Sequence, residues 1–177
     1  MAMTANERKR AQIQREQEAL RHIPDSTYPY LSVPFHRYIN DDGNWSDVQQ
    51  CFELMGVEPP QFEDDRGAAD FAFDDNFGSD QDKIDTFKGQ EKSIGRAEAM
   101  VGFLLDAASG LSRIINEFKK AEISRSLAEI QQRDLTDPDI RITTMAEVVY
   151  IARLQDELQK SVRRSFPQWE VKILPRS

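Results

Sequence analysis

Apolar side chains recur in steps of three and four residues along the stretch that begins at Ser93. This spacing brings them to one side of a helix and is typical of helices that pair in coiled coils. The pattern predicts one long helix over residues 93–133. Its apolar seam, the surface expected to mediate self-association, consists of Ile94, Ala97, Val101, Leu104, Ala108, Leu111, Ile115 and Phe118.

A second pattern with helical spacing follows the turn-forming residues 135–139. Thr144 and Glu147 match a capping box, so this helix is predicted to begin there and to end at Pro167. The short turn predicts a long antiparallel, coiled-coil-like hairpin. At 1.5 Å per residue, the first helix spans roughly 60 Å and the second roughly 33 Å. The hairpin therefore leaves about half of the long helix without a helical partner, and we expect another subunit or another part of the chain to cover it.

Two shorter elements are predicted outside these helices. Residues 46–56 are expected to form a short helix, because Ser46 and Gln49 match a capping box. Cys51 lies on its apolar side and is interpreted as a small buried side chain. The period-two alternation over residues 169–174 predicts one short C-terminal strand.

Three prolines within residues 24–34 predict an extended segment, because proline fixes φ and removes a backbone donor. The segment is too apolar for a free linker, since it carries Tyr28, Tyr30, Leu31 and Val33. We expect it to cross the helical surface as a strap. A docking surface for a partner, where aromatic side chains are enriched, is the alternative.

The predicted fold class is therefore mainly α. It combines the long antiparallel hairpin with a short packed helix, an extended proline-rich strap and one short C-terminal strand. Three segments of different character are expected: a basic helical arm (1–23), an acidic segment with prolines and aromatic residues (24–92), and the hairpin body with the strand (93–177).

Charge is distributed unevenly along the 177 residues, which carry 23 Lys and Arg against 31 Asp and Glu, a formal net charge of -8. Residues 1–23 hold five basic and three acidic side chains, residues 24–92 hold five and sixteen, and residues 93–177 hold thirteen and twelve. The acidic excess therefore lies entirely in the middle segment.

The basic arm offers candidate contacts to a nucleic acid or another partner, namely Arg8, Lys9, Arg10 and Arg15. Lysine and arginine bind phosphates by releasing counterions. The alternative interpretation is a solvated leading helix, because its apolar stripe is too thin to anchor it in a core.

The acidic segment offers a candidate partner surface made by Asp74, Asp75, Asp80 and Asp82. The spacing of these carboxylates does not match a calcium loop. Three interpretations stay open: a mimic of nucleic-acid phosphates, an acidic and aromatic segment that folds on binding, and a mobile acidic loop with a few phenylalanines fixed to the core. The sequence does not decide whether residues 61–90 are ordered.

Candidate catalytic chemistry is sparse. One cysteine and two histidines exclude a disulfide framework and a multi-cysteine zinc site, and no phosphate-binding, nucleophile-elbow or zinc-protease motif is present. The nearest carboxylate pairs, Glu117 with Glu122 and Asp156 with Glu157, do not share a helix face. We expect no enzymatic activity, no cofactor and no metal site. No apolar run reaches the ~20 residues of a membrane span, and no secretory signal is visible, so we expect a cytoplasmic protein.

These observations favour a non-enzymatic helical scaffold or regulatory protein that acts by self-association and macromolecular binding. The expected partners are a second copy of the chain and another protein, with nucleic acid as an open alternative and no membrane. The order of basic head, helical hairpin and terminal strand is loosely similar to that of phage small terminase subunits, which assemble as rings. This resemblance, confined to architecture, implies a phage- or plasmid-type accessory factor that binds nucleic acid in DNA packaging. A third alternative is an acidic inhibitor that mimics nucleic acid, and a fourth is a small all-α hydrolase.

Overall fold

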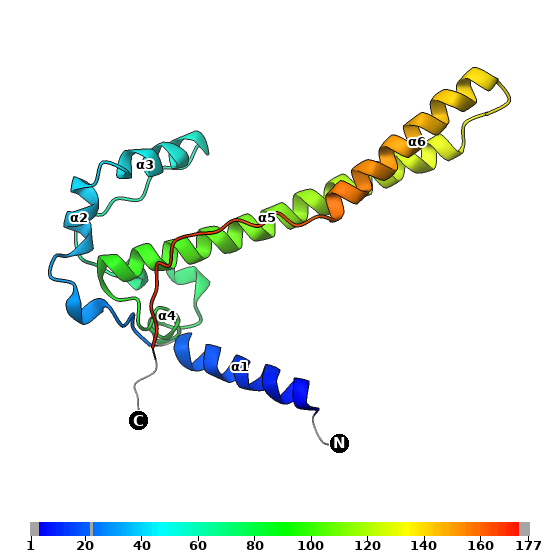
Figure 1. Ribbon diagram of the computed structural model, residues 1–177. Coiled ribbons are helices and arrows are strands. Elements are labelled where there is room, and N and C mark those ends of the chain that lie inside the picture. The colour runs from blue at the N-terminus through cyan, green and yellow to red at the C-terminus, as the bar shows by residue number, and fades with distance from the viewer. Residues whose placement is uncertain (1–3, 22, 174–177) are drawn as a thin grey trace. The chain divides into compact units, whose positions relative to one another are not determined.

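The computed structural model describes residues 4–21 and 23–173, and these residues are mainly helical (Figure 1). They form six α-helices and three short 3₁₀ helices. The α-helices are α1 (Ala5–Arg21), α2 (Phe35–Asp41), α3 (Trp45–Leu54), α4 (Asp80–Thr86), α5 (Lys92–Gln131) and α6 (Pro138–Gln159), and the 3₁₀ helices are η1 (Tyr28–Tyr30), η2 (Ala68–Asp70) and η3 (Asp74–Asn76). The predicted mainly α class is confirmed.

The chain divides into two compact units. Unit 1 contains Met1–Phe103 and Gln168–Ser177, and unit 2 contains Leu104–Pro167. Helix α5 begins in unit 1 and ends in unit 2.

The core of unit 1 is small and is built mainly from aromatic side chains of the acidic segment. Phe87 is buried with Ala68 and Ala99, and its ring lies 5.9 Å from that of Phe77. In a second cluster the ring of Phe62 lies 5.6 Å from that of Phe35 and 5.8 Å from that of Trp45, in edge-to-face contact.

Arg96 of α5 is buried between two aromatic rings of the same unit. Its guanidinium lies 3.5 Å from the ring centre of Phe71 and 4.6 Å from that of Phe62, and Nη1 donates to the carbonyl of Gln61 at 2.7 Å. Burial lowers the pKa of this guanidinium from its ordinary value. Cation–π contacts strengthen when the cation is desolvated, so Arg96 joins α5 to the residues on both sides of η2.

We therefore expect Arg96→Ala to reduce the free energy of unfolding by about 2 kcal/mol, because it removes both ring contacts and leaves a carbonyl without its donor. Arg66→Ala is the matched control. Arg66 also lies over Phe71, at 4.6 Å, but it is largely exposed, so its loss is expected to cost less than about 1 kcal/mol. Urea unfolding measures the free energy of unfolding of both variants. Equal losses in the two variants would contradict a stabilising role for the buried Arg96 contacts.

At the start of helix α5, the carboxylate of Asp65 accepts hydrogen bonds from Ser93 in the first turn. The Ser93 N–H donates to Asp65 at 3.2 Å and the Ser93 hydroxyl donates at 2.6 Å. Burial opposes ionisation of Asp65, but the two hydrogen bonds from Ser93 lower its pKa from the ordinary value. The backbone at the start of α5 is therefore capped by Asp65, a side chain distant in sequence.

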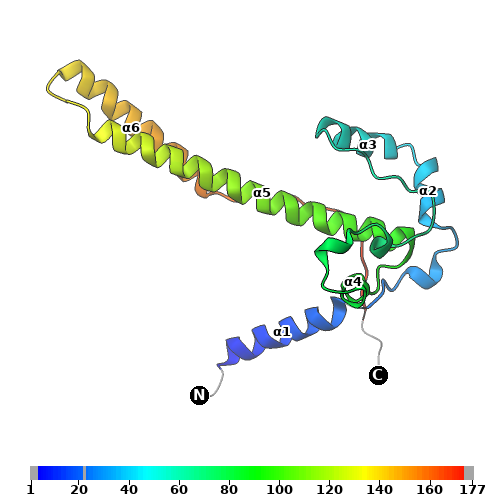
Figure 2. The same cartoon turned by 180° about the vertical axis from the view of Figure 1, so that it is seen from behind.

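In unit 2 the second part of α5 and helix α6 lie side by side, as both views show (Figures 1 and 2). Asn116 Nδ2 donates to the carbonyl of Leu158 at 2.8 Å, and Arg133 pairs with Glu147 at 2.6 Å. Ile130 of α5 and Ile151 of α6 are buried.

The predicted start of α6 is wrong by six residues. The helix begins at Pro138, and the side chain of Asp137 caps it by accepting from the Asp139 N–H. Thr144 is a buried residue within the helix, not its cap. Proline suits the first helical position because its φ is already helical and its missing N–H has no partner there. The helix also ends at Gln159, before the predicted Pro167.

Helix α3 matches the predicted element, but its details differ. The residue that precedes it is Asn44 and no side-chain cap is present; the Ser46 hydroxyl donates to the carbonyl of Gly43. Of its apolar side, Phe52 is buried, whereas Cys51 is exposed, so its interpretation as a buried side chain is wrong.

No strand is present among the described residues, so the predicted C-terminal strand is wrong. Residues 171 and 173 nevertheless form hydrogen bonds with Asp25 and Ser26. The Ser26 N–H donates to the carbonyl of Val171 at 2.7 Å, but the Val171 N–H donates to the carboxylate of Asp25 and the Ile173 N–H to the hydroxyl of Ser26. Side-chain oxygens therefore replace the backbone carbonyls that a β-ladder requires.

Within the proline-rich segment, Tyr28–Tyr30 form the 3₁₀ turn η1. The prediction of a fully extended segment is therefore wrong at this turn. Pro29 tolerates this turn because it lies at its beginning, where an N–H would have no partner.

Candidate functional site

Helix α5, which was predicted to mediate self-association, carries an exposed apolar surface. Leu104, Leu111, Ile115 and Phe118 are 45%, 59%, 43% and 63% exposed. They are seven, four and three residues apart and so share one helix face, which we call the α5 stripe. The first part of the predicted seam, formed by Ile94, Ala97 and Val101, is half-buried in unit 1.

The α5 stripe ends sharply towards the C-terminus of the helix. One and two heptads beyond Ile115, the same face carries Glu122 and Glu129, and one heptad beyond Phe118 it carries Arg125. Arg125 pairs with Glu122 at 2.8 Å. The exposed apolar surface thus extends over about four turns of the helix, and charged residues bound it at its C-terminal end.

A different face of α5 packs against α6. Ile130 is buried, Ile123 and Leu127 are half-buried, and Asn116 contacts α6 through its hydrogen bond to Leu158. Within unit 2, α5 therefore has two apolar faces, of which α6 covers one.

Helix α6 carries a second exposed apolar line. Ile142, Met145 and Val149 are exposed and are three and four residues apart; we call them the α6 stripe. They lie away from the side of α6 that faces α5, which includes buried Thr144 and Ile151.

The predicted basic contacts all lie exposed on α1. Arg8 and Arg15 are seven residues apart and share a face, and Lys9 and Arg10 follow Arg8 around the helix. The helix begins with a capping box that sequence reasoning missed: the Glu7 N–H donates to Thr4 Oγ1 at 3.3 Å, and the Thr4 N–H donates to the Glu7 carboxylate at 2.7 Å. The spacing Thr4-x-x-Glu7 was the signal that could have revealed it.

The predicted acidic surface is exposed but is not one uniform patch. Asp74 and Asp75 belong to η3, and Asp74 pairs with Lys83 of α4 at 2.8 Å. Asp80 and Asp82 lie in the first turn of α4, where the helix dipole favours carboxylates. At least three of the four residues therefore have a local structural role.

Unit 1 also contains a buried acidic group that the sequence did not reveal. Glu98 of α5 is only 6% exposed and accepts a hydrogen bond of 2.5 Å from the Tyr28 hydroxyl. Burial is the main cause that raises the pKa of Glu98 from its ordinary 4.5 to about 7, and the nearby carboxylates of Asp25 and Glu170 add to it. Burial and the bond to Glu98 raise the pKa of Tyr28 as well.

Ser93, His36 and Asp65 lie together, but not in the geometry of a catalytic triad. Ser93 is fully buried, its hydroxyl donates to Asp65 at 2.6 Å, and it accepts from the backbone N–H of His36 at 3.1 Å. A triad requires the histidine ring to bond to the serine hydroxyl. The arrangement therefore fixes the start of α5 and does not activate a nucleophile.

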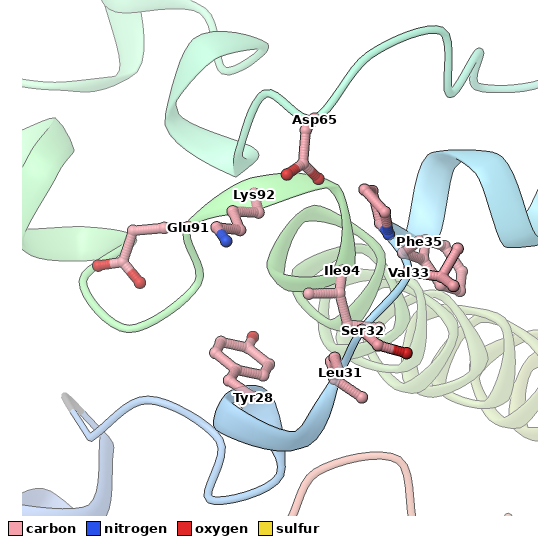
Figure 3. A pocket seen from close by; sticks show the side chains of 10 residues that line it. Tyr28, Leu31, Ser32, Val33, Phe35, Asp65, Glu91, Lys92 and Ile94 are labelled. Atoms are coloured by element: carbon pink, nitrogen blue, oxygen red, sulfur yellow. The ribbon is translucent and has the colours of Figure 1, made fainter.

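A hollow of about 260 Å³ lies between η1 and the beginning of α5. Figure 3 shows Tyr28 on one side of it and Asp65 and Lys92 on the opposite side, with Leu31 and Ile94 among the apolar residues that line it. Its volume is below the ~300–1,000 Å³ of typical ligand pockets, so we assign no ligand to it.

Within residues 4–21 and 23–173, no group of three or more His, Cys, Asp or Glu side chains is arranged to hold a metal ion. None of the helices described has the length and apolar character needed to cross a membrane. No protein-family model, curated protein or solved structure matches this chain.

Proposed function

We propose that this protein is a non-enzymatic helical scaffold that self-associates through the α5 stripe and binds a further macromolecule through its charged N-terminal half. The observation that carries the proposal is the exposure of four large apolar side chains on one face of α5. In this proposal α5 and α6 act as an antiparallel hairpin, in which α6 covers one apolar face and the stripe is left for a partner.

A helix of a second copy is the partner that the spacing favours. Alternating steps of three and four residues at Leu104, Ala108, Leu111, Ile115 and Phe118 form the a and d pattern of a coiled-coil seam. Ile114 beside it is also exposed, which widens the apolar face beyond a strict two-stranded seam and suits a bundle of helices. A second copy supplies a matching helix by symmetry.

The size of the exposed surface supports the same partner. Five large side chains at about half exposure present an area at the upper end of the ~300–600 Å² patch that ordinary monomers expose. With the adjoining atoms of α5, this approaches the ~800 Å² per partner of a standard protein interface.

The test is the absolute mass in solution, measured by light scattering on a sizing column over a range of concentrations and at low and moderate salt. We expect a mass that is a multiple of 20.4 kDa. The multiple should not fall with salt, because apolar association is not screened. A mass of one chain at every concentration would refute self-association.

A second candidate function, binding of nucleic acid, is favoured by the exposed basic side chains of α1. We expect binding of duplex DNA or RNA to weaken steeply with salt, because each phosphate contact releases counterions. Arg8→Ala/Lys9→Ala/Arg10→Ala should weaken it at least about tenfold at low salt and flatten its salt dependence. Fluorescence anisotropy measures both. Binding that these changes leave intact would remove the role assigned to α1.

A further inference from the structure

The C-terminal latch, as we call residues 168–173, forms hydrogen bonds within unit 1 that are centred on one buried carboxylate. Asp25 is buried, and its carboxylate accepts from the Val171 N–H and from both the N–H and the hydroxyl of Thr27. Ser26 adds one bond to the Val171 carbonyl at 2.7 Å and one from the Ile173 N–H at 3.0 Å. The latch contributes no regular secondary structure, and these hydrogen bonds fix its backbone beside residues 25 and 26.

Two charged groups of the latch, Glu170 and Lys172, act electrostatically on buried Glu98. Glu170 and Lys172 are both largely buried and pair at 3.5 Å, and the Gln90 amide lies 3.4 Å from Glu170. The ionisable groups that act on Glu98 are Asp25, Tyr28 of η1, and these two latch residues. When Glu98 is ionised, three carboxylates share this part of the unit with a single lysine.

We propose that the latch is gated by pH: neutral Glu98 lets it close, and ionised Glu98 weakens its attachment. An ionised, buried carboxylate is unfavourable beside two others, and opening of the latch relieves it by removing Glu170 and admitting water. The Tyr28 hydroxyl and Lys172 oppose this effect, since both stabilise the ionised form. The inference concerns unit 1 and does not depend on self-association.

The direction of the pH dependence follows from the proton affinities of the two states. In the closed state the pKa of Glu98 is about 7, whereas the ordinary value is 4.5. The closed state therefore binds the proton more tightly, and the contribution of Glu98 to closure is largest below pH 4.5. Closure weakens as pH rises from 4.5 to 7, by at most about 300-fold, and is constant above that range.

Backbone hydrogen exchange on the full-length protein tests this proposal, because it reports the opening equilibrium even when the open state is rare. The protection of the Val171 and Ile173 amides should be compared at pH 5.5 and 7.5, each normalised to the intrinsic exchange rate at that pH. We expect protection to fall at the higher pH, by up to about twentyfold. The amides of α6 in the same sample serve as the internal reference and should not change in this way.

Glu98→Gln is expected to abolish the pH dependence and to keep the latch closed at pH 7.5, because the amide stays neutral. Glu129→Gln, an exposed position on the same helix, is the matched control and should behave as the wild type. The proposal would be overturned if protection in the wild type did not depend on pH, or if protection in Glu98→Gln fell with pH as much as in the wild type. A second measurement needs no variant: the carboxyl carbon resonance of Glu98 should titrate near pH 7, and a midpoint below 5 would equally refute the gate.

Discussion

Replacement of Leu111 and Phe118 by glutamate is expected to turn a self-associated protein into a monomer with its helices intact. Both side chains are more than half exposed in the single chain, so their loss removes little from its own core. In an interface each would be buried, and each glutamate would then bring an unpaired charge into an apolar contact. Burial of one such side chain is worth about 2 kcal/mol, so we expect self-association to weaken at least about a thousandfold.

The matched control is Ser112→Glu/Ser124→Glu, which adds the same charge to exposed positions of the same helix outside the α5 stripe. This variant should retain the wild-type mass, because it leaves the stripe unchanged. Light scattering gives the mass, and circular dichroism should show equal helix content in all variants, since glutamate is a good helix former.

Three outcomes would contradict this result. An unchanged mass in Leu111→Glu/Phe118→Glu would show that the stripe does not mediate the association. If Ile142→Glu/Met145→Glu lowers the mass instead, the contact belongs to the α6 stripe. Loss of association in the serine control would show that added charge alone is responsible, and not the position of the side chains.

The long helices were predictable because their apolar spacing is a local property of the sequence. The period of three and four residues placed α5 correctly to within a few residues at either end. The start of α6 was missed because Thr144 and Glu147 match a capping box by chance, while Asp137-Pro138 is the stronger start signal. A capping pattern inside an amphipathic stretch is therefore weak evidence unless no earlier signal exists.

The buried cluster around Glu98 could not be predicted, because its members are brought together only by tertiary structure. Asp25, Tyr28, Glu98 and Glu170 lie far apart in the chain, and no spacing connects them. The same holds for the C-terminal segment. Its period-two alternation indicated a strand, but the sequence did not show that its pairing partners would be the side chains of Asp25 and Ser26.

Gly95→Ala is expected to cause the largest loss of stability of any change proposed for unit 1. A Cβ built at this position would lie 2.2 Å from the carbonyl carbon of Gln90 and 2.5 Å from its Cα and oxygen. These are backbone atoms of the turn that leads into α5, and the turn is fixed by Lys92 at a φ of 66° and by the Ser93–Asp65 bonds. The turn cannot move away at low cost, so we expect a loss of about 3–5 kcal/mol in the free energy of unfolding.

Gly102→Ala provides the control, because it makes the same change in the same helix, where nothing beyond the adjacent backbone of the helix itself lies within 4 Å of the added Cβ. Alanine restricts the unfolded chain more than glycine does, so this variant should gain up to about 1 kcal/mol. Urea unfolding at a fixed protein concentration measures both, since self-association also contributes to apparent stability. The two glycines have equal helix propensity, so opposite signs isolate the contact with Gln90. If both variants were stabilised, the Gln90 turn would not pack against α5, and the attachment of Asp65 to Ser93 would have to be revised with it.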